Sequence, residues 1–148
     1  MNGHDTHNEH TFDPPDGMYV RFDPRTIANN PWVTTRRHTY SSSIARVIVP
    51  KGFACDLASV PSWLLWLFGP YSRHQRAAVF HDAGYRLQYA SRFEIDALFR
   101  SIMAADRVVL WKRLLLYYGV RLFGFVAWRR NQKGVHHFRA RVLSKGSN

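Results

Sequence analysis

A chain of 148 residues has the length of one ordinary domain, and it can bury enough apolar surface to fold without disulfides or metal ions. Hydrophobic residues make up 46% of the chain, which excludes a largely disordered protein. The single cysteine, Cys55, excludes an intramolecular disulfide and the paired cysteines of zinc ribbons and redox motifs.

The formal net charge of +11 is distributed unevenly along the chain. Residues 1–16 form a polar arm with four acids and no Lys or Arg, whereas residues 129–148 form a basic tail with six cations and no acid. We therefore expect a single domain at residues 17–128 between an acidic arm and a basic tail. The excess of cations is compatible with a polyanionic partner, which can be nucleic acid, an anionic membrane surface or an acidic protein surface, but a basic surface in contact with solvent is the more common explanation.

The N-terminal arm has neither the cationic n-region nor the apolar h-region of a secretory signal. We therefore expect no signal peptide. The segments at residues 17–23 and 32–50 alternate in polarity and favour β-branched and aromatic residues, which predicts three extended segments of a small antiparallel sheet. Pro50, Lys51 and Gly52 interrupt this run, and residues 53–63 are predicted to form a loop that leads into a short helix.

Two capping boxes predict the next two helices. Ser72 with Gln75 precedes the first predicted helix, and Ser91 with Glu94 precedes the second. Only about Gln88 to Ala90 remain for the turn, so the helices should form an antiparallel hairpin.

The segment 108–130 predicts a long amphipathic C-terminal helix, but Lys112, Arg113 and Arg121 interrupt it too often for a membrane span of about 18 apolar residues. At 100° per residue its apolar side chains share one face, opposite the three cations. We expect this face to pack on the core, with a helix lying on a membrane surface as the alternative. The face consists of Trp111, Leu114, Leu115, Tyr118, Leu122, Phe125 and Val126. A short strand is expected at residues 135–143.

The candidate site lies on the predicted hairpin. His81 and Tyr85 share one stripe of the first helix, and Asp96 is at the edge of the apolar stripe of the second. An antiparallel hairpin should bring Asp96 close to both side chains. A carboxylate on one imidazole nitrogen fixes the tautomer, so that the other nitrogen can accept a proton from water. Asp96 would then orient His81, the general base.

The same residues are also compatible with a purely structural cluster, in which buried His, Tyr and Asp side chains satisfy one another and fix the helix pairing. Asp82 points to the side of this stripe and could bind calcium together with Asp56, since calcium prefers oxygen ligands. Cys55 could act as a nucleophile served by His81, although a small buried hydrophobe is the more common role of a free cysteine. The N-terminal histidines His4, His7 and His10 and the pair His136-His137 lack the ordered helical spacing of a metal site.

The motif order resembles a phage and prophage family known as domain of unknown function 1353. The resemblance covers about Val49 to Gly124 and rests on an Asp-Leu-Ala-Ser-Val-Pro loop, a His-Asp-x-x-Tyr helix and an Asp-x-x-Phe helix. It implies a viral or prophage origin, with the protein in a virion or in the host cytoplasm before assembly. Its motif residues here are Asp56, Ser59, Pro61, His81, Asp82, Tyr85, Asp96 and Phe99.

The His-Asp-x-x-Tyr helix is also similar to that of secretory phospholipases of the A-two type and of the lipase domain of parvovirus capsids. This similarity implies His81 as base, Asp82 as calcium ligand, Tyr85 as supporting hydroxyl and Asp96 as orienter. The glycine-rich calcium loop and the helix cysteines of those enzymes are not present in this sequence.

The sequence thus predicts an α+β domain with a small N-terminal antiparallel sheet, a helical hairpin and a long C-terminal helix. It favours a structural or accessory component of a phage particle, in the tail region, that contacts other phage proteins. The alternative is a small hydrolase centred on His81 and Asp96 that cleaves a lipid or cell-wall bond. Non-specific nucleic-acid binding through the basic tail is the third hypothesis.

Overall fold

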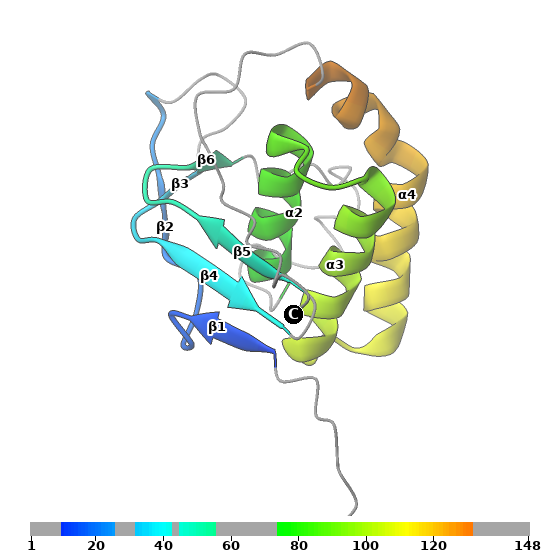
Figure 1. Ribbon diagram of the computed structural model, residues 1–148, viewed down its shortest axis with the longest axis horizontal. Helices are drawn as coiled ribbons and strands as arrows, with labels where there is room; N and C mark the ends of the chain where they lie inside the picture. Colours follow the sequence, from blue (N-terminus) through cyan, green and yellow to red (C-terminus); the bar gives the residue numbers. More distant parts are fainter. Residues whose placement is uncertain (1–9, 26–31, 43–44, 56–73, 132–148) are drawn as a thin grey trace, which may run out of the picture.

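The computed structural model describes residues 10–25, 32–42, 45–55 and 74–131. Within these ranges the chain forms six short strands and then three helices, labelled α2, α3 and α4 in Figure 1. The α+β class and the order of sheet before helices are therefore as the sequence predicts. The predicted loop at residues 53–63, with the short helix that follows from it, falls largely outside the described residues, and the predicted strand at residues 135–143 falls entirely outside them.

The strands form two antiparallel sheets of three strands each. The first has the order β1-β4-β5, and the second has the order β2-β3-β6. The sequence predicts one small sheet, and it predicts no strand in the N-terminal arm, where β1 pairs with β4. The strands are β1 (Thr11–Asp13), β2 (Val20–Phe22), β3 (Trp32–Thr34), β4 (His38–Ser41), β5 (Arg46–Val49) and β6 (Ala54–Cys55).

The helical hairpin has the predicted arrangement. Helix α2 (Gln75–Leu87) and helix α3 (Arg92–Ala105) run side by side, and the chain turns between them at residues 88–91. Ser91 and Glu94 form the predicted capping box of α3. The described part of α2 begins at Gln75 with His74 as N-cap, and Ser72 of the first predicted capping box lies outside the described residues.

The core lies between the first sheet and the hairpin. Figure 1 shows α2 next to the strands, with α3 beside it and α4 (Leu110–Asn131) on the side away from the strands. Buried side chains from β4 and β5 pack with those of α2 and α3 in one cluster. Its largest members include Tyr40, Phe80 and Phe99, all of which are almost fully buried. This core fixes the hairpin on the sheet and leaves the outer face of the hairpin for α4.

The orientation of α4 differs from the predicted one. The stripe Leu116, Val120 and Gly124 is buried, whereas most of the predicted core face points to solvent, with Trp111 57% and Leu122 66% exposed. The side chains at these three positions are small or of medium size, so α4 can approach the hairpin closely. Arg121 faces inward because the buried carboxylate of Asp96 accepts a hydrogen bond from it. The apolar face predicted from helical periodicity is therefore not the side of the helix that is buried. No described helix is long and apolar enough to cross a membrane.

Candidate functional site

Helix α2 positions two side chains of the site one turn apart. His81 and Tyr85 are separated by four residues, which places them on the same helix face, and their ring centroids lie 4.2 Å apart. Gly84 lies between them in the sequence, and a Cβ there would stand 2.6 Å from Cγ2 of Ile95 on α3. The missing side chain therefore allows α3 to approach close enough for hydrogen bonds across the hairpin.

Asp96 on α3 accepts hydrogen bonds from both α2 side chains. Its Oδ1 lies 2.8 Å from Nε2 of His81 and 2.8 Å from the hydroxyl oxygen of Tyr85. Asp96 is fully buried, and His81 is only 4% exposed. The structure thus brings together the three residues that the sequence predicts for the catalytic group.

Arg121 on α4 completes this cluster. Its Nη1 donates to the second carboxylate oxygen of Asp96, Oδ2, at 2.8 Å. The sequence does not predict Arg121 as a site residue, because helical periodicity places it on the arc of cations opposite the apolar face. One signal in the sequence could have indicated this role: Arg121 lies inside an apolar helix, and the helix before it contains an aspartate that is buried. We refer to His81, Tyr85, Asp96 and Arg121 as the Asp96 cluster.

Further contacts hold α4 against the hairpin. Nη2 of Arg92 on α3 donates to the backbone carbonyl of Arg121 at 3.1 Å. The ring of Trp128 meets that of Tyr85 edge to face at 5.3 Å, and the side-chain amide of Gln88 donates to the carbonyl of Trp128 at 3.0 Å. Arg121 is therefore positioned by its own helix packing as well as by its ion pair.

The charges in the Asp96 cluster follow from these contacts. Burial raises the pKa of Asp96, but hydrogen bonds from His81, Arg121 and Tyr85 outweigh burial and hold it below its usual value. Burial lowers the pKa of His81 and outweighs the hydrogen bond to Asp96. Arg121 also neutralises part of the carboxylate charge, which weakens the attraction of Asp96 for a protonated imidazole. Near neutral pH the cluster therefore contains an ionised Asp96 and a neutral His81.

The tautomer of His81 follows from its partner. An ionised carboxylate can only accept, so Nε2 of the neutral imidazole must carry the hydrogen, and Nδ1 keeps its lone pair. Among the described residues, no group forms a hydrogen bond with Nδ1. The arrangement leaves one basic nitrogen available for a proton, while a buried carboxylate stabilises the imidazolium that would result.

Asp82, predicted as a calcium ligand, is bound to an arginine. Oδ1 of Asp82 accepts from Nε of Arg86 at 3.3 Å, and Oδ2 lies 3.3 Å from Nη2. Arg86 also donates to the carbonyl of Ala54 at 2.6 Å, which links α2 to β6. Asp56 lies outside the described residues. Within the described ranges no group of three or more His, Cys, Asp or Glu side chains could hold a metal ion, and because Asp56 lies outside these ranges, a calcium site with Asp82 stays a prediction.

Cys55, the alternative candidate for a nucleophile, is a fully buried member of the core cluster at the end of β6. This environment is that of a small hydrophobic side chain. His10, one of the N-terminal histidines, contacts the Tyr40 hydroxyl at 2.6 Å through Nδ1. Neither residue contributes to the Asp96 cluster.

Comparison with known proteins gives one family. Residues 32–120, more than half of the chain, match the family described as "Protein of unknown function (DUF1353)". The chain belongs to this family, as the motif resemblance predicts. The matched range includes His81, Tyr85 and Asp96 and ends one residue before Arg121. No curated protein and no solved structure matches the chain.

Proposed function

We propose that this protein is a small hydrolase in which His81 is the general base and Asp96 orients it, and that its substrate is an ester bond of a lipid. The observation that carries the proposal is the fixed tautomer of His81, with Nε2 bound to a buried, ionised carboxylate and Nδ1 without a hydrogen-bond partner in the described chain. The similarity of the His-Asp-x-x-Tyr helix to phospholipases supports the lipid substrate.

In the proposed reaction Nδ1 of His81 takes a proton from water, and the resulting hydroxide attacks the ester carbonyl carbon. The tetrahedral intermediate then breaks the bond to the leaving alkoxide, which receives the proton from the imidazolium. The products are a carboxylic acid and an alcohol. Asp96 remains ionised throughout and stabilises the imidazolium, and Tyr85 and Arg121 keep its two oxygens in place.

The burial of the cluster limits how a substrate can approach. Since only 4% of His81 is exposed, the proposal requires a water molecule, rather than the bulk of the substrate, to reach Nδ1. No step is assigned to calcium, because Arg86 binds the carboxylate of Asp82.

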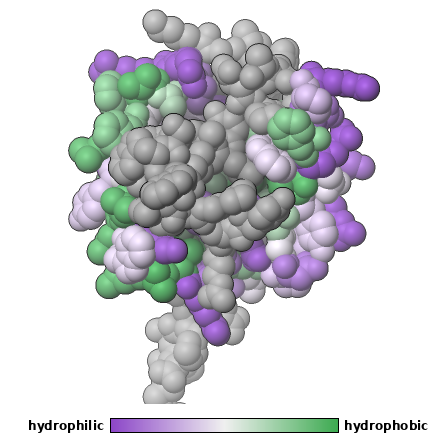
Figure 2. All heavy atoms as spheres, turned by 180° about the vertical axis from the view of Figure 1, so that it is seen from behind, coloured by the Kyte–Doolittle hydropathy of each residue, from purple (hydrophilic) through white to green (hydrophobic). Residues whose placement is uncertain are grey.

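The exposed face of α4 supports a membrane surface as the place of reaction. Figure 2 shows apolar side chains along the edge of the molecule where α4 lies. Helix α4 also carries five cations and no acid, so an apolar strip is combined with positive charge, as in helices that lie on anionic bilayers. The exposed apolar residues of α4 are Leu110, Trp111, Leu115, Tyr118, Leu122, Phe123, Phe125 and Val126.

A vesicle assay tests the reaction. We expect release of fatty acid from vesicles that contain phosphatidylglycerol, and a loss of about 100-fold or more in His81→Gln, because general bases contribute about 10²–10⁴-fold. Cys55→Ser is the control that should retain activity. Absence of any fatty-acid release by the folded wild type would reject the lipid-hydrolase proposal.

Co-sedimentation tests the membrane contact separately. Leu122→Ser should weaken binding to vesicles containing phosphatidylglycerol by about tenfold, because it removes one exposed leucine from the strip. Phe22→Ser is a matched control, since Phe22 is 59% exposed on β2 rather than on α4. Equal losses in both variants would show that α4 is not the contact.

A structural or accessory component of a phage particle is the second candidate function. The observation that favours it is the saturation of Asp96, which accepts from three side chains on two other helices and could serve only to fix the three helices. Quantitative mass spectrometry of purified particles tests this function, with a fixed copy number as the expected result. The predicted basic tail lies almost entirely outside the described residues, so nucleic-acid binding remains a prediction, testable by salt-sensitive DNA binding.

A further inference from the structure

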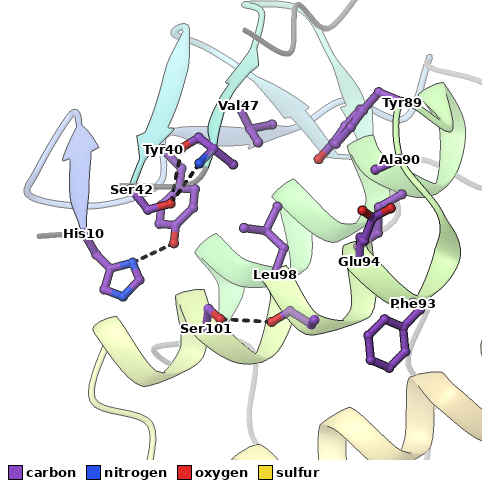
Figure 3. A pocket seen from close by; sticks show the side chains of 13 residues that line it. His10, Tyr40, Ser42, Val47, Tyr89, Ala90, Phe93, Glu94, Leu98 and Ser101 are labelled. Carbon is purple, nitrogen blue, oxygen red and sulfur yellow. Dashed lines mark hydrogen bonds between the residues drawn. The ribbon is translucent and has the colours of Figure 1, made fainter. Parts of the chain in front are cut away.

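A pocket of about 470 Å³ lies on a part of the molecule that the proposed reaction does not use. It is formed between β4 and β5 on one side and the first half of α3 on the other, with the α2–α3 turn at one end (Figure 3). None of the four residues of the Asp96 cluster lines it. The volume falls within the range of small-molecule sites.

The walls of the pocket are mostly apolar. Val47 projects from the sheet side and Leu98 from α3, and Ile95, Ala97 and Phe93 continue the wall along the helix. Binding of an apolar ligand to such a wall is favourable, because it removes apolar surface of both the ligand and the wall from water.

Tyr89 supplies an unused hydrogen-bond donor. Its hydroxyl is buried, points into the pocket in Figure 3 and has no hydrogen-bond partner among the described residues. Burial raises the pKa of Tyr89, so the hydroxyl keeps its hydrogen at all ordinary pH values. A buried donor without a partner is costly in a folded protein, which makes an acceptor oxygen in the pocket favourable.

Three other polar side chains around the pocket, those of Tyr40, Ser101 and Glu94, already have partners. The hydroxyl of Tyr40 contacts His10, and that of Ser101 donates to the carbonyl of Ala97 at 3.1 Å. Glu94, at the rim, accepts from the backbone amide and hydroxyl of Ser91, and these bonds hold the pKa of Glu94 below its usual value. Its negative charge disfavours an anionic ligand.

We propose that this pocket binds an uncharged, mainly apolar small molecule whose carbonyl oxygen accepts a hydrogen bond from Tyr89. The ligand class includes ketones and esters with a short alkyl chain. This binding site is distinct from the proposed hydrolytic site. No residue of the Asp96 cluster lines the pocket, and no pocket residue takes part in the hydrogen bonds of Asp96 with His81 and Arg121.

Three probes of equal chain length separate the contributions to binding. Ligand-observed NMR with the full chain should detect 2-octanone, with weaker binding of octane, which has no acceptor, and of octanoate, which is anionic. In Tyr89→Phe the affinity for 2-octanone should fall about three- to tenfold and become equal to that for octane, since one neutral hydrogen bond is lost. The melting temperature of ligand-free Tyr89→Phe should not fall.

A second variant tests the location without changing any polar group. Ala97→Leu places a larger side chain in the pocket and should abolish binding of all three probes, whereas Ala104→Leu, at an exposed position on the same helix, should have no effect. The proposal is overturned if 2-octanone does not bind the wild type at millimolar concentration, if Tyr89→Phe binds it equally well, or if octanoate binds as tightly as 2-octanone. Because vesicle hydrolysis is not measured, failure here leaves the proposed reaction intact.

Discussion

Gly124 on α4 stands directly against the hydroxyl of Tyr85 on α2, and a Cβ at position 124 would lie 2.5 Å from that oxygen. The same hydroxyl donates to Asp96, so it cannot move away without losing its acceptor. The absence of a side chain at position 124 of α4 is therefore a condition for the hydrogen bond between α2 and α3.

Gly124→Ala should destabilise the protein by about 1–3 kcal/mol, because the added methyl group forces α4 or Tyr85 to shift. Alanine has the higher helix propensity, so any loss must come from packing. Chemical denaturation measures the change. In the background of Tyr85→Phe, where the nearest atom is gone, the same substitution should cost less; equal costs in both backgrounds would contradict the explanation.

Arg121→Gln should raise the pKa of His81. Removal of the guanidinium leaves the full carboxylate charge of Asp96 to act on the imidazole, which favours its protonated form. The pKa can be followed by NMR of the His81 ring protons. Arg129→Gln is the matched control, since Arg129 is an exposed cation near the end of α4. An unchanged His81 pKa in Arg121→Gln would show that the ion pair does not set the charge of the base.

Acidification should destabilise the fold through His81. Its pKa is lowered by burial from 6.5, so between the two values the unfolded chain binds more protons than the folded chain. This contribution is complete above about pH 6.5 and is lost as pH falls through the window below it, with a limiting slope of about 1.4 kcal/mol per pH unit. Urea denaturation between pH 8 and pH 5 measures it.

The buried histidines His38 and His74 also have lowered pKa values, owing first to burial, and add to the same trend. The contribution of His81 is therefore the difference in pH dependence between the wild type and His81→Gln. A variant with the same slope as the wild type would mean that the pKa of His81 is the same in the folded and unfolded chains, which would contradict the effect of burial.

Ser91→Ala should cost about 1 kcal/mol of stability, because the capping box loses its side-chain acceptor. Thermal unfolding measures the loss. Ser101→Ala is a suitable comparison, since Ser101 only donates back to the carbonyl of Ala97 within the helix and should change stability less. Similar effects of the two substitutions would argue against the cap.

Local signals in the sequence were sufficient for the hairpin and its site. The capping box at Ser91 and the spacing of His81, Tyr85 and Asp96 predict a contact that depends only on two neighbouring helices and a short turn. The pairing of β1 with β4, which joins Thr11 to Ser41, depends on residues far apart in the chain and has no comparable local signature.

The orientation of α4 could not be obtained in the same way. Both sides of this helix are apolar, so periodicity gives no clear inner face. The buried side of α4 is determined by the fit of Gly124 against Tyr85 and by the charge of Asp96. Tyr85 and Asp96 lie on the partner helices, so the sequence of α4 alone does not contain this information. Arg121 was missed for the same reason.

The position of Arg121 also has a consequence for synthesis on the ribosome. Arg121 follows Asp96 by 25 residues and lies on the last described helix, so α2 and α3 emerge before it. Before Arg121 is added, only two of the three side chains that donate to Asp96 are present, so the full carboxylate charge acts on His81. We expect docking of α4 to lower the pKa of His81, because Arg121 then neutralises part of that charge.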